Sequence, residues 1–276
     1  MKFSEDTSNQ LLRALNYPYW RPKESYVYDS GSILKLTSPC TGDLKRSIVD
    51  ADGSRLSLEE YACRAGWPVA ELESLRTPLL AHGSNASPVQ LSLKFPGRAG
   101  YRTVIPVIRG TLKNYTVVYA AQFSKYGAIP ATLAYEDGAH TDIFMCMVTE
   151  KQLQEFNLSE GLGDRYDLLR LPKGTATLVD DTLVASPAAY IATGGALFAG
   201  NRYWRVRNAG NARHEPDLTV DQRRIQQIVM ELLNDPREVE EFIVDLLNNP
   251  NVRKERNRLL KDYSRSFEDS LPEAGQ

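Results

Sequence analysis

The chain has 276 residues, of which 42% are hydrophobic and 25% are charged. This balance supports a buried core and excludes a chain that is disordered throughout. The 33 basic and 35 acidic residues give a net charge of −2, so electrostatics predict no nucleic acid and no anionic membrane as partner. One main core with sizeable extensions is expected at this length.

The three cysteines, Cys40, Cys63 and Cys146, are widely spaced. They fit neither a disulfide framework nor a zinc site, so free thiols in a reducing compartment are expected. The polar N-terminus lacks the apolar run of a signal peptide, and no stretch of the sequence approaches the apolar length of a membrane span. A cytoplasmic location is therefore expected.

Residues 1–75 are interpreted as an N-terminal α/β extension. Closely spaced leucines predict a helix that ends before Pro18. Apolar and aromatic residues predict short strands at 26–28 and 33–36. A second helix is predicted at 57–65, since its first and fourth residues, Ser and Glu, have the spacing of a capping box.

Residues 76–215 are dominated by strand patterns. β-branched and aromatic residues predict strands at 103–108, 115–121, 131–135 and 141–148. Asp137 and Gly138 predict a hairpin turn between the last two strands. One helix is expected after Thr149. Several strands with few helices favour an α+β fold built on a small, strongly curved sheet or barrel.

Residues 216–276 are interpreted as a C-terminal helical segment. Apolar residues from Ile225 to Leu233 have helical spacing, and the pattern recurs from Val239 to Leu247. Proline follows each run, which predicts a helical hairpin and then a third, basic helix. The apolar stripes are expected to be buried within the chain. Binding of a protein partner, or self-association, is the alternative.

The main candidate for a functional loop is His82, Gly83, Ser84 and Asn85, which follows a short apolar run. Such a loop places backbone N–H groups and small polar side chains at the end of a sheet. Gly83 can take positive φ, which lets consecutive amides converge on an anionic oxygen. The alternative is an ordinary turn in which Ser84 and Asn85 hydrogen-bond their own backbone, and the four residues alone favour that alternative.

Glu160, followed by Gly161, is a candidate for proton transfer. It stands at the end of the helix expected after Thr149. A carboxylate in a partly desolvated pocket has a raised pKa and can move a proton near neutral pH. Most glutamates at helix ends are simply solvated, so Glu160 alone would be interpreted as a surface residue.

Four segments, which follow one another in the same order as in the family, resemble the γ-glutamylcyclotransferase-like family. LLAHGSNASPVQL (79–91) resembles the Tyr-Gly-Ser-Asn loop that opens that fold, and RGTLKNYTVVYAAQ (109–122) its second barrel stretch. YGAIPATL (126–133) resembles a Gly-containing strand, and MVTEKQLQEFNLSEG (147–161) a strand, helix and Glu-Gly turn. The resemblance covers about a third of the chain and leaves both flanking sections unexplained.

The resemblance implies a small mixed β-barrel and an intramolecular cyclotransferase. In that family the α-amine of a small γ-glutamyl substrate attacks its own γ-carbonyl, so that 5-oxoproline forms and an amine or amino acid leaves. Glu160 corresponds to the acid/base glutamate. Gly83, Ser84 and Asn85 would hold the glutamyl head group, and Tyr166 would form a wall. No metal or organic cofactor is implied.

His82 departs from the family pattern, because the family usually has Tyr there. Imidazole could donate a hydrogen bond, or titrate near its ordinary pKa of about 6.5 and make activity pH-dependent. The departure puts the family's usual substrate in doubt and leaves a second hypothesis open. The domain would then be a non-catalytic module that binds a ligand or a protein.

Other candidates are weaker. His82, His140 and His214 lack metal-ligand spacing. Cys146 lies in an apolar run, which favours a buried structural thiol over a nucleophile paired with His140. Arginines at 202, 205 and 207 alternate with aromatic residues. The near-neutral charge favours an edge strand with exposed arginines over a nucleic-acid surface.

Overall fold

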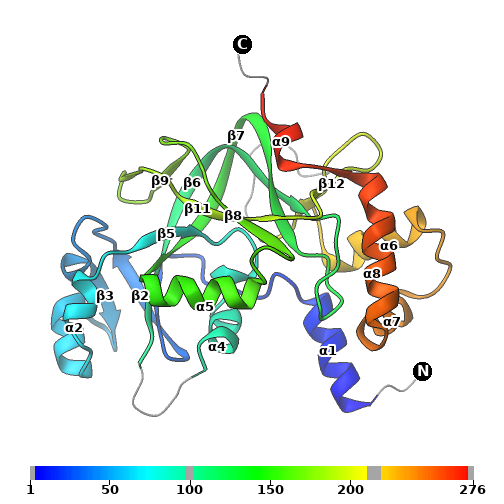
Figure 1. The fold of residues 1–276 in the computed structure, drawn as a ribbon. Coiled ribbons are helices and arrows are strands. Elements are labelled where there is room, and N and C mark those ends of the chain that lie inside the picture. Colours follow the sequence, from blue (N-terminus) through cyan, green and yellow to red (C-terminus); the bar gives the residue numbers. More distant parts are fainter. Residues whose placement is uncertain (1–3, 97–101, 210–218, 273–276) are drawn as a thin grey trace.

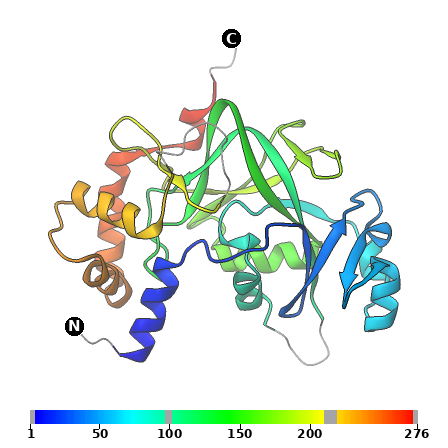
Figure 2. The same ribbon diagram turned by 180° about the vertical axis from the view of Figure 1, so that it is seen from behind.

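The computed structural model describes residues 4–96, 102–209 and 219–272. A large, mostly antiparallel sheet runs through the molecule, with helices packed around it (Figures 1 and 2). The protein is of the α+β class, as the sequence predicts. The boundary expected at 215/216 lies outside the described residues, as does His214.

The first 75 residues form the helices and strands that their patterns predict. α1 ends ahead of Pro18, and Ser57 and Glu60 form both hydrogen bonds of a capping box at the start of α2. The elements in this section are α1 (Glu5–Leu15), β1 (Tyr26–Asp29), β2 (Ser32–Ser38), β3 (Ile48–Ala51), β4 (Ser54–Ser57), α2 (Leu58–Ala65) and α3 (Ala70–Glu73), with a short 3-10 turn at Leu44–Arg46.

The middle of the chain supplies most of the sheet and two helices beside it. Its elements are β5 (Thr77–Leu80), a 3-10 turn η2 (Ser84–Ala86), α4 (Pro88–Lys94), β6 (Val104–Tyr119), β7 (Ala131–Val148), α5 (Glu150–Glu160), β8 (Tyr166–Arg170), β9 (Ala176–Leu178), β10 (Leu183–Val184), β11 (Ala188–Ala192), β12 (Ala196–Leu197) and β13 (Arg205–Val206). α5 begins at Thr149, whose side chain forms a capping box with Gln152.

The strands pair in the order β4, β3, β2, β1, β6, β7, β5, β11, β8, while β9 and β13 attach to β6. Neighbours are antiparallel except for β5 with β11 and β13 with β14 (Thr219–Val220). Among the described strands no pair joins β4 to β8, so the sheet is not closed and the expected barrel is not confirmed. Because β2, β3 and β4 pair outward from β1, they extend the sheet at one end (Figure 1).

The prediction of a hairpin turn at Asp137 and Gly138 is wrong. β7 continues through these residues and pairs with β6 on both sides of them, while 136–139 have no partner in β6, so four expected strands are two long ones. Asn114 and Gly138 both have positive φ, of 63° and 71°, and the Gly138 N–H donates to Asn114 Oδ1 at 3.1 Å. The register shifts between Lys113 and Tyr115, so a bulge bends both strands where a turn was expected.

The C-terminal section contains the expected helical hairpin and third helix, α6 (Gln222–Leu232), α7 (Val239–Asn248) and α8 (Pro250–Leu260). They are followed by a 3-10 turn at Lys261–Tyr263, by β15 (Ser264–Arg265), which pairs with β12, and by α9 (Phe267–Ser270). Most of the apolar stripe residues are buried; Phe242 of α7, for example, packs edge-on against Phe123 with ring centroids 5.7 Å apart. The expectation that the stripes are buried within the chain is confirmed.

α6 is also tied to the central section by buried hydrogen bonds. The side chain of Gln222 accepts from the Ile129 N–H at 3.1 Å and donates to the Ile129 carbonyl. Gln226 donates to the Gly127 carbonyl at 2.8 Å. α6, α7 and α8, together with α1, lie at the end of the molecule opposite to α2 and β3 (Figures 1 and 2).

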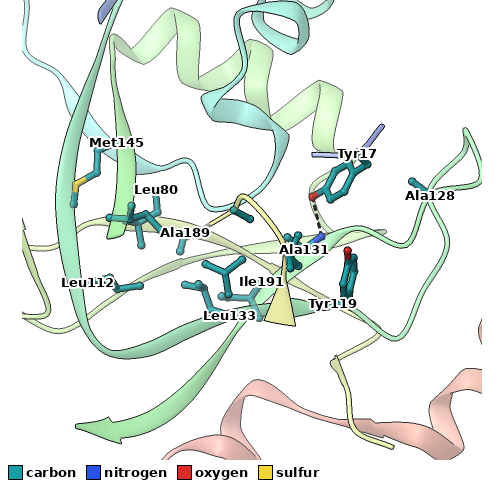
Figure 3. Packing of buried hydrophobic residues seen from close by; sticks show 14 of the residues in the cluster. Tyr17, Leu80, Leu112, Tyr119, Ala128, Ala131, Leu133, Met145, Ala189 and Ile191 are labelled. Atoms are coloured by element: carbon teal, nitrogen blue, oxygen red, sulfur yellow. Dashed lines mark hydrogen bonds between the residues drawn. The ribbon is translucent and has the colours of Figure 1, made fainter. Parts of the chain in front are cut away.

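Side chains from distant parts of the sequence meet on the concave side of β6 and β7. Figure 3 shows Leu80 of β5, Leu133 of β7 and Ile191 of β11 gathered there, and all three are buried. Tyr17, from the segment after α1, points into the same region, where its hydroxyl accepts from the Ala131 N–H at 2.8 Å. In the part of the chain that the structure describes, no helix has the length and apolar character of a membrane span.

Candidate functional site

The predicted loop follows β5 and leads through η2 into α4. Gly83 has φ −115° and not the positive φ expected. A glycine is needed at this position because there is no room for a side chain: an added Cβ would lie 2.4 Å from the Tyr17 hydroxyl. That hydroxyl is held by its bond to the Ala131 N–H. Residues 17, 83 and 131 are therefore packed together at one wall of the site.

Glu160, the last residue of α5, contacts this loop directly. The Asn85 side chain donates from Nδ2 to Glu160 Oε1 at 3.1 Å, across 75 residues of sequence. The Lys94 ammonium, at the end of α4, forms an ion pair with the same oxygen. Oε2 has no hydrogen-bond partner among the described residues. Oε1 is thus hydrogen-bonded by the protein twice, and Oε2 is available to a ligand in the cavity.

Lys94 is held in place on several sides. It donates to Ser159 Oγ at 2.8 Å, and its nitrogen lies 4.8 Å from the centre of the Phe156 ring. The Lys94 side chain is only 3% exposed and that of Glu160 17%. A lysine side chain is rarely buried this fully unless its ammonium has a fixed acceptor. The Lys94–Glu160 ion pair is therefore an ordered part of the site.

These groups line one cavity of about 620 Å³. Every residue that the sequence singled out for the site lies on its wall: His82, Gly83, Ser84, Asn85, Glu160 and Tyr166. Residues that the sequence analysis missed also line it, among them Tyr17, Lys94, Gln122, Tyr126, Arg165 and Tyr190. The structure brings the loop and the helix end together, which any joint chemistry of theirs requires.

The electrostatic state of Glu160 differs from the expectation. Burial alone would raise its pKa, as the sequence analysis supposed. The ammonium of Lys94, together with the hydrogen bonds from Lys94 and Asn85, outweighs burial and lowers the pKa below its ordinary value. Glu160 is therefore ionised at neutral pH and presents a negative charge to the cavity.

His82 is also not in the state expected. Its side chain is buried, the residue being 5% exposed. Burial lowers the pKa of the imidazole to about 4, although the charge of Glu160 opposes this. His82 is thus neutral at physiological pH, and titration near 6.5 is ruled out. Its Nδ1 is buried and has no hydrogen-bond partner among the described residues.

Tyr166 forms part of the cavity wall by packing on other aromatic residues. It is buried and meets Tyr190 edge-on, with ring centroids 6.3 Å apart. Tyr190 in turn donates to Asn157 Oδ1 at 2.7 Å. Gln122 donates to the Arg165 carbonyl at 3.1 Å and so holds the turn between α5 and β8. The wall on this side is rigidly braced.

The missed residues carried little signal in the sequence. Lys94 is an unremarkable lysine at the end of a short helix, and only the meeting of the C-terminal ends of α4 and α5 places it on Glu160. Tyr17 lies 66 residues before Gly83 in the chain. Its contact depends on how the segment after α1 folds back.

The weaker candidates have clear positions. Cys146 is buried, its thiol donates to the Asn85 carbonyl at 3.5 Å, and burial raises its pKa to about 12. His140 is exposed on the same strand, so the two form no nucleophilic pair. Arg205 is buried and pairs with Glu136, so the expectation of exposed arginines is wrong there. Within the described ranges no three His, Cys, Asp or Glu side chains form a group that could hold a metal ion.

No protein-family model and no curated protein matches this chain. Solved structures that are similar to it in fold include the following three. An uncharacterised protein from Homo sapiens has 16% identity and a TM-score of 0.35, over 62% of this chain and 87% of its own. A γ-glutamyl cyclotransferase has 12% identity and a TM-score of 0.36, over 68% and 99%. A protein from Arabidopsis thaliana has 12% identity and a TM-score of 0.34, over 73% and 96%. The likeness to these three is in the fold alone.

Proposed function

We propose that the cavity binds a small γ-glutamyl compound and converts it to 5-oxoproline by intramolecular attack, releasing an amine or amino acid. The observation that carries the proposal is the hydrogen bond from Asn85 to Glu160 within a single cavity. It joins the two segments that the sequence motifs single out. Cyclisation within one molecule needs a folded substrate and one group that transfers protons, and no cofactor.

Glu160 Oε2 is the atom assigned to proton transfer. It faces the cavity while Lys94 and Asn85 hold Oε1. In the reaction the α-nitrogen forms a bond to the γ-carbonyl carbon, and the bond from that carbon to the leaving nitrogen breaks. The α-ammonium loses two protons to become the ring N–H, and the leaving nitrogen gains two to depart as an ammonium. Glu160 takes up these two protons one after the other from the α-nitrogen and passes each to the leaving nitrogen.

The remaining residues position the substrate. Backbone N–H groups of Gly83 and Ser84 and the Asn85 amide are assigned to the glutamyl head group. The cationic side chains of Lys94 and Arg165 add positive charge to the wall, which favours the α-carboxylate. Tyr166 closes the side of the cavity and limits how the substrate folds.

A non-catalytic binding module is the second candidate, and the Lys94–Glu160 ion pair favours it. An α-ammonium that approaches Glu160 must share the carboxylate with an ammonium already bound there. His82, neutral and buried, also provides no phenolic hydroxyl. In this alternative the cavity holds an anionic ligand, and the outer faces of the C-terminal helices bind a protein partner or a second copy.

The test is release of 5-oxoproline from a panel of γ-glutamyl amines and γ-glutamyl amino acids, measured by mass spectrometry. Glu160→Gln removes the proton acceptor and keeps the shape, so the proposal expects a loss of about 100-fold or more. Glu155→Gln, an exposed position on the same helix, is the matched control.

Equal turnover by the wild type and Glu160→Gln would remove Glu160 from its assigned role. No turnover of any panel member by the wild type, with ligands still bound, would favour the binding module.

A further inference from the structure

A second concave surface lies behind the wall of the first cavity. It encloses about 910 Å³ between the segment that follows α1, the paired strands β6 and β7, and the residues after β13. Tyr17 lines both cavities. None of the site residues singled out from the sequence lines this second surface, so the proposed function leaves it unexplained.

Its charges are unbalanced. Four cationic side chains line it, those of Arg21, Lys23, Arg109 and Arg207, against two carboxylates. Both carboxylates are already engaged. Asp142 pairs with Arg109 at 3.6 Å, and Asp221 pairs with Arg207 at 3.0 Å while capping α6. The surface therefore has a net positive charge that its own acids do not neutralise.

Neither acid forms an ion pair with Arg21 or Lys23 in the part of the chain that the structure describes, although the charge of Asp142 acts on Arg21 at longer range. Nη1 of Arg21 is buried without a hydrogen-bond partner among the described residues, whereas Nε and Nη2 are not buried in this way and are open to the cavity. The guanidinium lies 5.0 Å from the centre of the Phe144 ring, which supports one face of it. Burial, together with the like charge of Arg109, lowers the pKa of Arg21 to about 10. A half-buried guanidinium without a carboxylate paired to it is unfavourable, and an anion at its accessible nitrogens would compensate its charge.

We propose that this surface binds a small oxyanion, a carboxylate or phosphate group, which accepts hydrogen bonds from Nε and Nη2 of Arg21 and is further attracted by Lys23 and Arg109. The planar guanidinium suits both groups because its parallel N–H donors match two oxygens of either one. Phe144 fixes the guanidinium plane, so little side-chain entropy is lost on binding. Trp20, 64% exposed, stands at the rim.

The test is calorimetric titration of the full chain at low ionic strength with two probes, inorganic phosphate and citrate, which separate the two sources of oxyanion. Arg21→Gln is expected to weaken binding of the preferred probe by about tenfold or more. Arg55→Gln, at an exposed position of β4, is the matched control and is expected to bind as the wild type does. Circular dichroism establishes that each variant is folded.

Asp142→Asn supplies a test in the opposite direction. It releases Arg109 from its ion pair, and the affinity is expected to rise severalfold, a gain that misfolding cannot mimic. Absence of binding of both probes to the wild type would overturn the proposal. So would equal affinities of the wild type and Arg21→Gln, or equal losses in Arg21→Gln and Arg55→Gln.

Discussion

The ammonium of Lys94 is hydrogen-bonded to the carboxylate of Glu160 inside the candidate site. It joins the end of α4 to the end of α5, two helices that flank the loop at 82–85. The pair decides the ionisation of the carboxylate, since without Lys94 burial would raise the pKa of Glu160. Any chemistry proposed for Glu160 therefore depends on Lys94.

Replacement of Lys94 by Met is expected to raise the pKa of Glu160, because desolvation would no longer be opposed by the ammonium. The native pKa is lowered, so the pair stabilises the fold at neutral pH, and this contribution disappears as the pH falls through the native pKa. A carbon-13 NMR titration of the Glu160 carboxylate measures the change. Lys94→Arg should keep the lowered pKa, and Lys113→Met, at an exposed position, should not alter it. An unchanged Glu160 pKa in Lys94→Met would contradict the assignment.

His82 is expected to make the protein less stable in mild acid. Its native pKa of about 4 lies below the ordinary value, so the unfolded chain binds a proton that the folded chain excludes. The free energy of unfolding therefore falls as the pH drops from about 6.5 towards the native pKa, by at most about 3 kcal/mol from this residue. Chemical denaturation of the wild type and His82→Gln between these pH values gives the difference.

The slope against pH should be smaller in His82→Gln than in the wild type. His140→Gln, at an exposed position of β7, should retain the slope of the wild type. The same slope in all three proteins would show that His82 is not the titrating group.

Gly83→Ala is expected to destabilise the fold by about 1–3 kcal/mol, because the new methyl group would overlap the Tyr17 hydroxyl. Tyr17→Phe removes that hydroxyl, so the double variant should be less destabilised than the sum of the two single changes. Urea denaturation measures all four proteins. Gly42→Ala is the control, since an added Cβ there meets no atom within 4 Å. Strictly additive effects at 17 and 83 would argue against the contact.

Gln222→Leu is expected to lower the free energy of unfolding by about 2–4 kcal/mol, because it leaves both backbone groups of Ile129 without partners in a buried position. Gln227→Leu on the same helix removes only a contact with Arg224 and should have a small effect. Thermal or urea denaturation measures the free energy of unfolding of both variants and of the wild type. Similar stabilities for the two variants would mean that α6 is only loosely attached to the central section.

Local patterns predicted much of the secondary structure. The capping box at Ser57 and the apolar spacing of α6 and α7 depend on neighbours along the chain, so the sequence displays them directly. The same holds for the candidate loop and Glu160, whose residue types are visible without a structure. The hairpin at Asp137 failed because Asp-Gly also suits a bulge, and which of the two forms depends on the partner strand.

The sequence by itself determined most of the longer helices, the α+β class and the residues most suited to chemistry, because these follow from residue type and short-range spacing. Only the tertiary structure decided that the sheet is not closed, that Tyr17 packs on Gly83, and that Lys94 meets Glu160. These relationships join residues far apart in the chain, and no local pattern encodes such distances. The ionisation of Glu160 is decided in the same way, because the ammonium that lowers its pKa arrives from another helix.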